Sequence, residues 1–140
     1  MRGELKANQW LLLLFVGLTA WVVPGAGHFV IREKKRAIII FVTIVATFCI
    51  GLYVGSIGVV NPRIAKGWYI AQMMNSPAVA ALAEATHRSE QEGAGYMTFG
   101  WPNEIGQIYT STAGLLNLLC IVNAVYLAYL RCIEQKPEGT

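Results

Sequence analysis

The sequence contains no aspartate, and charged residues make up only 14% of its 140 residues. Soluble domains carry roughly 25% charged residues. The shortage is concentrated in three stretches, because residues 7–31, 37–62 and 105–130 contain no Glu, Lys or Arg. A charged side chain at the centre of a bilayer costs about 2.5–3.5 kcal/mol on insertion scales. The missing charge therefore predicts an integral membrane protein.

Each charge-free stretch is long enough to cross a bilayer, since about 20 apolar residues span the hydrocarbon layer. We expect an all-α fold, one membrane domain with three transmembrane helices over about residues 9–31, 37–60 and 105–130. Residues 61–104 are expected to form an extramembrane loop bearing one or two short interfacial helices. Within this loop, Ser76 and Pro77 predict the start of a helix over residues 78–88, as an N-cap serine followed by a first-turn proline.

The first stretch is interrupted at Pro24-Gly25-Ala26-Gly27-His28. Proline removes a backbone donor and glycine loosens a helix, so a kink or a break is expected there. In lipid, the carbonyl that proline frees one turn earlier needs another donor. We expect the His28 imidazole to supply it, and ligation of a haem or a chlorophyll magnesium is the alternative role for this residue. A secretory signal peptide is a rival interpretation of the stretch, but the apolar character continues beyond the break.

Small residues recur at helical spacing in the second and third stretches. Small residues four apart let another helix approach closely, and a face of small and weakly polar side chains should meet protein and not lipid. The sequence therefore predicts helix packing at these positions. The predicted packing residues are Gly51, Gly55 and Gly58 in the second stretch, and Gly114, Asn117 and Ala124 in the third.

The residues that carry most enzyme chemistry are scarce. Of the two histidines, His28 is expected near one face of the membrane and His87 beyond the other, so they cannot ligate one haem together. Cys49, Cys120 and Cys132 form no CxxC pair, which predicts neither a metal site nor a disulfide framework. The sequence has no HExxH or GxSxG motif. We expect no catalysis and no resident cofactor.

Basic residues cluster between the first and second predicted helices, at Arg32, Lys34, Lys35 and Arg36. A short basic loop is the usual cytoplasmic signature of a membrane protein and can contact anionic lipid head groups. Its place between two spans argues against nucleic-acid binding. With three spans, this turn and the C-terminus are expected in the cytoplasm of a bacterial inner membrane. The N-terminus and residues 61–104 are then expected in the periplasm.

Residues 21–29, with the sequence WVVPGAGHF, precede this basic turn and a long apolar helix. The arrangement resembles the two-transmembrane-domain family of small bacterial membrane proteins, whose hallmark is a Pro-Gly-x-Gly-His-Phe/Tyr stretch between two helices. Residues 105–110 and 113–119 are similar to a third-helix pattern in an uncharacterised three-helix branch. The resemblance implies a bacterial membrane protein and does not imply any enzymatic activity.

Three functions stay open on this evidence. The small-residue faces favour a non-catalytic structural or accessory subunit of a larger membrane complex, with other membrane subunits and lipid as its partners. The second hypothesis is a pigment- or haem-associated subunit that uses His28. The third is a small homo-oligomeric channel lined by Thr110, Thr112 and Asn117.

Overall fold

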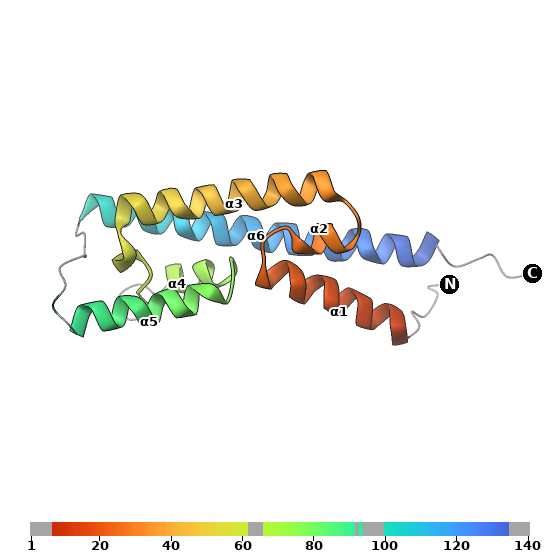
Figure 1. Cartoon of the computed structure of the whole chain (residues 1–140), viewed down its shortest axis with the longest axis horizontal. Helices are drawn as coiled ribbons and strands as arrows, with labels where there is room; N and C mark the ends of the chain where they lie inside the picture. Colours follow the sequence, from red (N-terminus) through yellow and green to blue (C-terminus); the bar gives the residue numbers. More distant parts are fainter. Residues whose placement is uncertain (1–6, 62–65, 92, 94–99, 135–140) are drawn as a thin grey trace, which may run out of the picture.

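The computed structural model describes residues 7–61, 66–91, 93 and 100–134, and within these residues the secondary structure is entirely helical (Figure 1). The longest helix, α6 (Trp101–Glu134), runs through the length of the molecule. Helix α3 (Lys34–Gly55) lies along it in the opposite direction. Both helices are long and apolar enough to cross a membrane.

The first predicted span is not one helix. The chain forms α1 (Ala7–Val22) and α2 (Ala26–Val30), separated by a turn at residues 23–25. Near its start, α1 lies against the end of α6, where Gln9 Nε2 donates to the Cys132 carbonyl at 3.2 Å. Near its end, the Ala20 carbonyl lies 3.4 Å from Asn117 Nδ2, halfway along α6.

After the turn the chain runs back to the end from which it came. The Arg131 guanidinium, near the end of α6, donates to the carbonyl of Ile31 and to Glu33 Oε1, the latter at 2.7 Å. Residues 7–31 therefore form a hairpin, and the start of α1 lies at the same end of the molecule as the 32–36 turn (Figure 1). The predicted break is confirmed, but residues 9–31 do not form the single span expected, because both ends of this segment lie against the end of α6.

The reversal follows from the residues at the break. Pro24 has no N–H with which to continue α1. Gly25 has a φ of 84°, in the left-handed region that glycine occupies without strain. A Cβ on Gly25 would lie 2.6 Å from the carbonyl oxygen of Ala37, and a Cβ on Gly27 would lie 2.7 Å from the Cβ of Ala20. The two glycines thus let α2 fold back tightly against both α1 and α3.

A second hairpin lies on the other half of α6. Near the start of helix α4 (Lys66–Met73), Ser111 Oγ of α6 donates to the Trp68 carbonyl at 3.2 Å. From there α4 runs toward the middle of α6. Helix α5 (Ala78–Gln91) returns, and Thr86 Oγ1 donates at 2.9 Å to the Ile57 carbonyl. This carbonyl belongs to η1 (Ile57–Val59), a short 3₁₀ helix that follows α3. Both helices of this hairpin lie within the predicted 61–104 loop.

The helix start predicted at Ser76 and Pro77 is confirmed. The Ala78 amide donates to Ser76 Oγ at 3.2 Å, and α5 begins at this residue. Figure 1 shows α1 and α5 nearly end to end below α6, with the two hairpin tips facing one another near the middle of the molecule.

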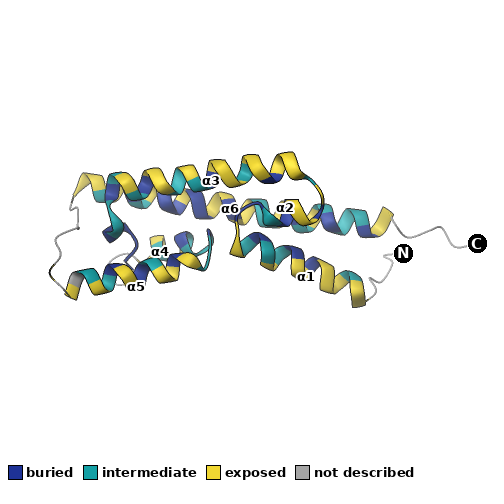
Figure 2. Ribbon diagram, in the orientation of Figure 1, coloured by how far each residue is buried: buried dark blue, intermediate teal, exposed yellow. Residues whose placement is uncertain are grey.

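The interface between α3 and α6 contains buried positions (Figure 2), and glycines lie at its closest contacts. A Cβ on Gly51 would lie 2.9 Å from the Thr110 amide nitrogen, and a Cβ on Gly55 would lie 2.9 Å from the Cα of Gly106. The predicted packing of the second helix through Gly51 and Gly55 is therefore made against α6 of the same chain. Gly58 is buried in η1 and not in α3, so it is not part of this helix face.

We predict that Gly106→Ala lowers the free energy of unfolding by about 1–3 kcal/mol. Its new Cβ would lie 2.7 Å from the Cα of Gly55 and 2.8 Å from the Gly51 carbonyl oxygen, so the two helices must separate. Gly67→Ala is the matched control, because a Cβ there meets nothing within 4 Å. Thermal unfolding in detergent, followed by tryptophan fluorescence, measures both. Equal midpoints for the two variants would contradict this packing.

Candidate functional site

The two hairpin tips meet α6 at a group of polar side chains, here named the polar junction: Trp21, Gln72, Asn75, Ser76, Thr110 and Asn117. At its centre is Asn117, which is fully buried halfway along α6. Its Nδ2 donates to the carbonyls of Asn75 at 2.8 Å and Met74 at 3.0 Å, and lies 3.4 Å from that of Ala20. One amide group therefore contacts backbone carbonyls at the ends of both α1 and α4.

The need for a donor at the proline break is real, but the predicted donor is wrong. In a continuous helix the residue at position 24 would donate to the carbonyl of Ala20, four residues earlier. Pro24 cannot do so, and Asn117 of α6 takes its place. His28 lies on α2, beyond the turn, and its hydrogen bond goes elsewhere.

Two further hydrogen bonds join the hairpins directly. Trp21 Nε1 of α1 donates to the Met73 carbonyl at 3.0 Å, and Ser76 Oγ donates to the Val22 carbonyl at 2.9 Å. Each hairpin thus supplies a donor for a helix-end carbonyl of the other. Carbonyls at helix ends have no partner within their own helix, and an unpaired one in an apolar environment is costly.

The polar junction extends along α6 through a buried glutamine on α4. Gln72 Nε2 donates to Thr110 Oγ1 at 2.8 Å and to the Val59 carbonyl at 3.3 Å. Thr110 Oγ1 in turn donates to the carbonyl of Gly106 at 2.9 Å. The side-chain oxygens of Gln72, Asn75 and Asn117 are buried without a hydrogen-bond partner in the described part of the chain. The junction is therefore richer in acceptors than in donors.

His28 is 2% exposed and points from α2 toward α6. Its Nε2 lies 3.1 Å from Asn123 Oδ1, so Nε2 carries the proton and donates to this oxygen. Nδ1 is buried and accepts no hydrogen bond among the described residues. The ring therefore positions α2 on α6 through a side chain, and not through a backbone carbonyl as expected. Ligation of a haem or chlorophyll by His28 stays a prediction.

The predicted packing residues of the third span all lie inside this chain. A Cβ on Gly114 would lie 1.9 Å from the Ala71 carbonyl oxygen of α4, and Ala124 lies in an apolar cluster with residues of α1. Thr110 and Asn117 are buried as well, whereas Thr112 is exposed. These three residues share no common surface within the single chain, and the homo-oligomeric channel stays a prediction.

The basic residues of the turn are exposed at one end of the molecule, and they are Arg32, Lys34, Lys35 and Arg36. Arg131 joins them from α6, held by Glu33 and the Ile31 carbonyl. The sequence did not predict this ion pair, nor the roles of Trp21 and Gln72. The described residues contain no group of three or more His, Cys, Asp or Glu side chains that would hold a metal ion.

We predict that Asn117→Leu lowers the free energy of unfolding by about 2 kcal/mol or more, because the carbonyls at two hairpin tips lose their donor. Thr112→Val is the control, since it removes an exposed hydroxyl from the same helix. Thermal midpoints in detergent measure the difference. An unchanged midpoint for Asn117→Leu would show that the carbonyls find other partners and that this amide does not hold the tips.

A double-mutant cycle tests the contact between His28 and Asn123. We predict that His28→Leu and Asn123→Leu each destabilise the fold and that their effects are coupled by about 0.6 kcal/mol, a typical hydrogen bond between membrane helices. Additive effects would contradict the hydrogen bond. A visible absorbance band that is present in the purified protein and lost in His28→Leu would instead identify His28 as a cofactor ligand.

No curated protein matches this chain, and no solved structure matches it either. A family does match, over residues 15–136. The match includes the α1–α2 turn, both hairpin tips and almost all of α6, and so covers every residue of the polar junction. The resemblance to the two-transmembrane-domain proteins stays a prediction. The chain belongs to the family of unknown function DUF6677.

Proposed function

We propose that this chain is an accessory subunit of a bacterial membrane protein complex, without catalytic activity of its own. In this proposal α3 and α6 cross the cytoplasmic membrane, and the two hairpins enter it from opposite sides. The length of α6 supports this placement. Glu104 and Arg131 are 27 residues apart, about 40 Å along a helix, close to the thickness of a bilayer with its head groups.

The distribution of charge supports an orientation. With α1 and α2 as a hairpin, the N-terminus, the 32–36 turn and the C-terminus share one side. Eight of the eleven Lys and Arg residues fall on that side. Three of these, Arg2, Lys6 and Lys136, lie outside the described residues and are assigned by their sequence neighbours. This side is then cytoplasmic by the positive-inside rule, and residues 61–104 face the periplasm.

A polar side chain on the outer face of α6 carries the proposal for a partner. Asn123 is exposed, and six residues place it about 9 Å along the helix from Asn117. Its oxygen accepts from His28, but its NH₂ group makes no hydrogen bond among the described residues. At this depth lipid offers no acceptor. A carbonyl or polar side chain of another membrane protein would satisfy this amide.

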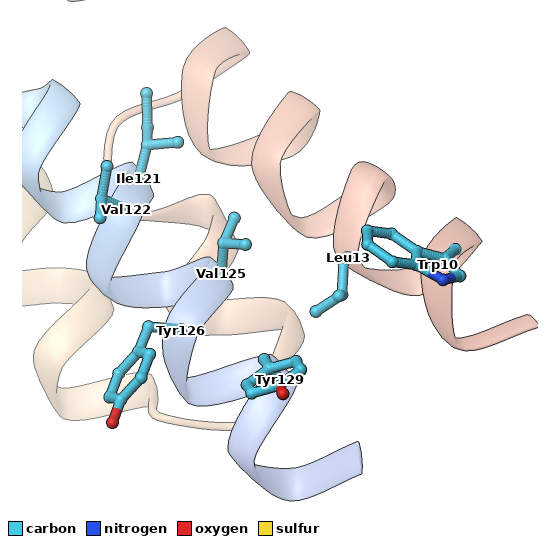
Figure 3. Close-up of a pocket in the computed structure, with 7 residues that line it drawn as sticks. All are labelled: Trp10, Leu13, Ile121, Val122, Val125, Tyr126 and Tyr129. Carbon is cyan, nitrogen blue, oxygen red and sulfur yellow. The ribbon is translucent and has the colours of Figure 1, made fainter. Parts of the chain in front are cut away.

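The same stretch of α6 also has a surface that can receive another helix. A groove of about 410 Å³ lies between α1 and α6 (Figure 3), and it is lined by Trp10, Leu13, Ile121, Val122, Val125, Tyr126 and Tyr129. Val122 and Tyr126, which line the groove, are exposed, and so is Leu119 at helical spacing from them. An exposed apolar ridge next to a groove suits the packing of a partner's transmembrane helix, whose side chains fill the groove. The small-residue faces no longer support the proposal, since they pack within this chain.

We predict that the protein purifies from its native membrane in a complex larger than its own 15.3 kDa, and that Val122→Trp disrupts this complex by filling the groove. Ile39→Trp is the matched control, because Ile39 is 65% exposed on α3, away from the groove. Native gels in mild detergent, with identification of the co-purifying chains, provide the measurement. A wild-type monomer, or equal losses in both variants, would contradict the proposal. A complex of this chain alone would favour a homo-oligomer over an accessory subunit.

A further inference from the structure

A cleft of about 470 Å³ lies between the start of α1, the end of α2 and the end of α6. Its wall is divided between two guanidinium groups and aliphatic side chains, and it is lined by Leu12, Val30, Ile31, Arg32, Ala128, Arg131 and Cys132. Its volume is in the usual range for small-molecule sites, about 300–1,000 Å³. The wall therefore offers charge and apolar surface to the same occupant.

The two arginines differ in how much of their positive charge is paired within the chain. Arg131 forms an ion pair with Glu33 at 2.7 Å and also donates to the Ile31 carbonyl, so its charge is largely matched within the chain. Arg32 is exposed and forms no ion pair among the described residues. Its φ of 64° holds it in the left-handed region at the turn between α2 and α3. The cleft thus retains about one net positive charge, which suits an occupant with one negative charge.

The cleft lies at a depth where a bilayer changes from polar to apolar. Arg131 is 14 residues beyond Asn117, about 21 Å along the helix, which is the level of the phosphates if Asn117 lies at the midplane. Ala128 is about 16 Å from the midplane by the same measure, at the boundary of the hydrocarbon layer. The aliphatic wall of the cleft therefore lies closer to the bilayer midplane than its arginines do. A phospholipid has the same arrangement, with its acyl chains nearer the midplane than its phosphate.

We propose that this cleft binds one anionic phospholipid, with its phosphate on Arg32 and Arg131 and the start of an acyl chain against Leu12 and Val30. The proposal rests on the membrane placement of α6 given above, but not on a partner subunit. Lys34, Lys35 and Arg36 lie next to the cleft and raise the local positive potential, and the cytoplasmic leaflet supplies the anionic lipid. A phospholipid with one negative charge, such as phosphatidylglycerol, matches the charge of Arg32.

Lipid binding to the detergent-purified full chain tests the proposal by native mass spectrometry. We expect phosphatidylglycerol to bind at least tenfold more tightly than phosphatidylcholine with the same acyl chains. Arg32→Asn should weaken phosphatidylglycerol binding about tenfold, as for the loss of a charged hydrogen bond, and asparagine tolerates the left-handed backbone. The matched control Lys35→Asn removes the same charge outside the cleft and should change binding by less than about twofold, as an exposed charge does.

Three results would overturn the proposal. Equal binding of the two lipids would show no preference for the anionic head group, and equal losses in Arg32→Asn and Lys35→Asn would show attraction without a site. Glycerol phosphate binding as tightly as phosphatidylglycerol would show a phosphate site in which the acyl chain has no part. The lipid site and the subunit proposal fail separately, because a monomer that binds phosphatidylglycerol at Arg32 would refute only the latter.

Discussion

The fold depends on the Asn117 amide of α6, which contacts backbone carbonyls at the ends of two other helices. Helices α1 and α4 both end beside it, from opposite directions, and each leaves backbone carbonyls without a donor of its own. In water those carbonyls would be solvated, but in the apolar surroundings proposed here they need a partner within the protein. One side chain on α6 therefore binds the tips of both hairpins at the same place.

Small residues on α6 make this arrangement possible. Three separate elements contact the same helix closely: α3 at Gly106, α4 at Gly114, and α2 at Ala124 through Gly27. Large side chains at these positions would hold the hairpins too far away for Asn117 and Thr110 to reach them. The hydrogen bonds of the polar junction therefore depend on the close packing of these helices. The apolar surface on the outside of the molecule is available to lipid and to the proposed partner.

Local signals in the sequence predicted the two long helices, the start of α5 and the break at Pro24. Length and hydropathy could not predict the hairpin, because 25 apolar residues fit one spanning helix as well as two shorter helices that reverse. The direction of the chain after the break depends on contacts with residues about 100 positions away, such as that between Arg131 and Ile31. The same limit explains His28: the motif indicated a hydrogen bond, but its partner is Asn123, on a distant helix.

The central claim is that α1 and α2 enter and leave the membrane on one side. Single cysteines at Asn8, Lys34 and Gln91, in a variant in which Cys49, Cys120 and Cys132 are replaced by alanine, test it directly. All three labelling positions are exposed. With sealed membrane vesicles and an impermeant maleimide, Asn8→Cys and Lys34→Cys should react from the same side and Gln91→Cys from the opposite side. Reaction of Asn8→Cys from the side of Gln91→Cys would contradict the hairpin and restore a spanning first helix.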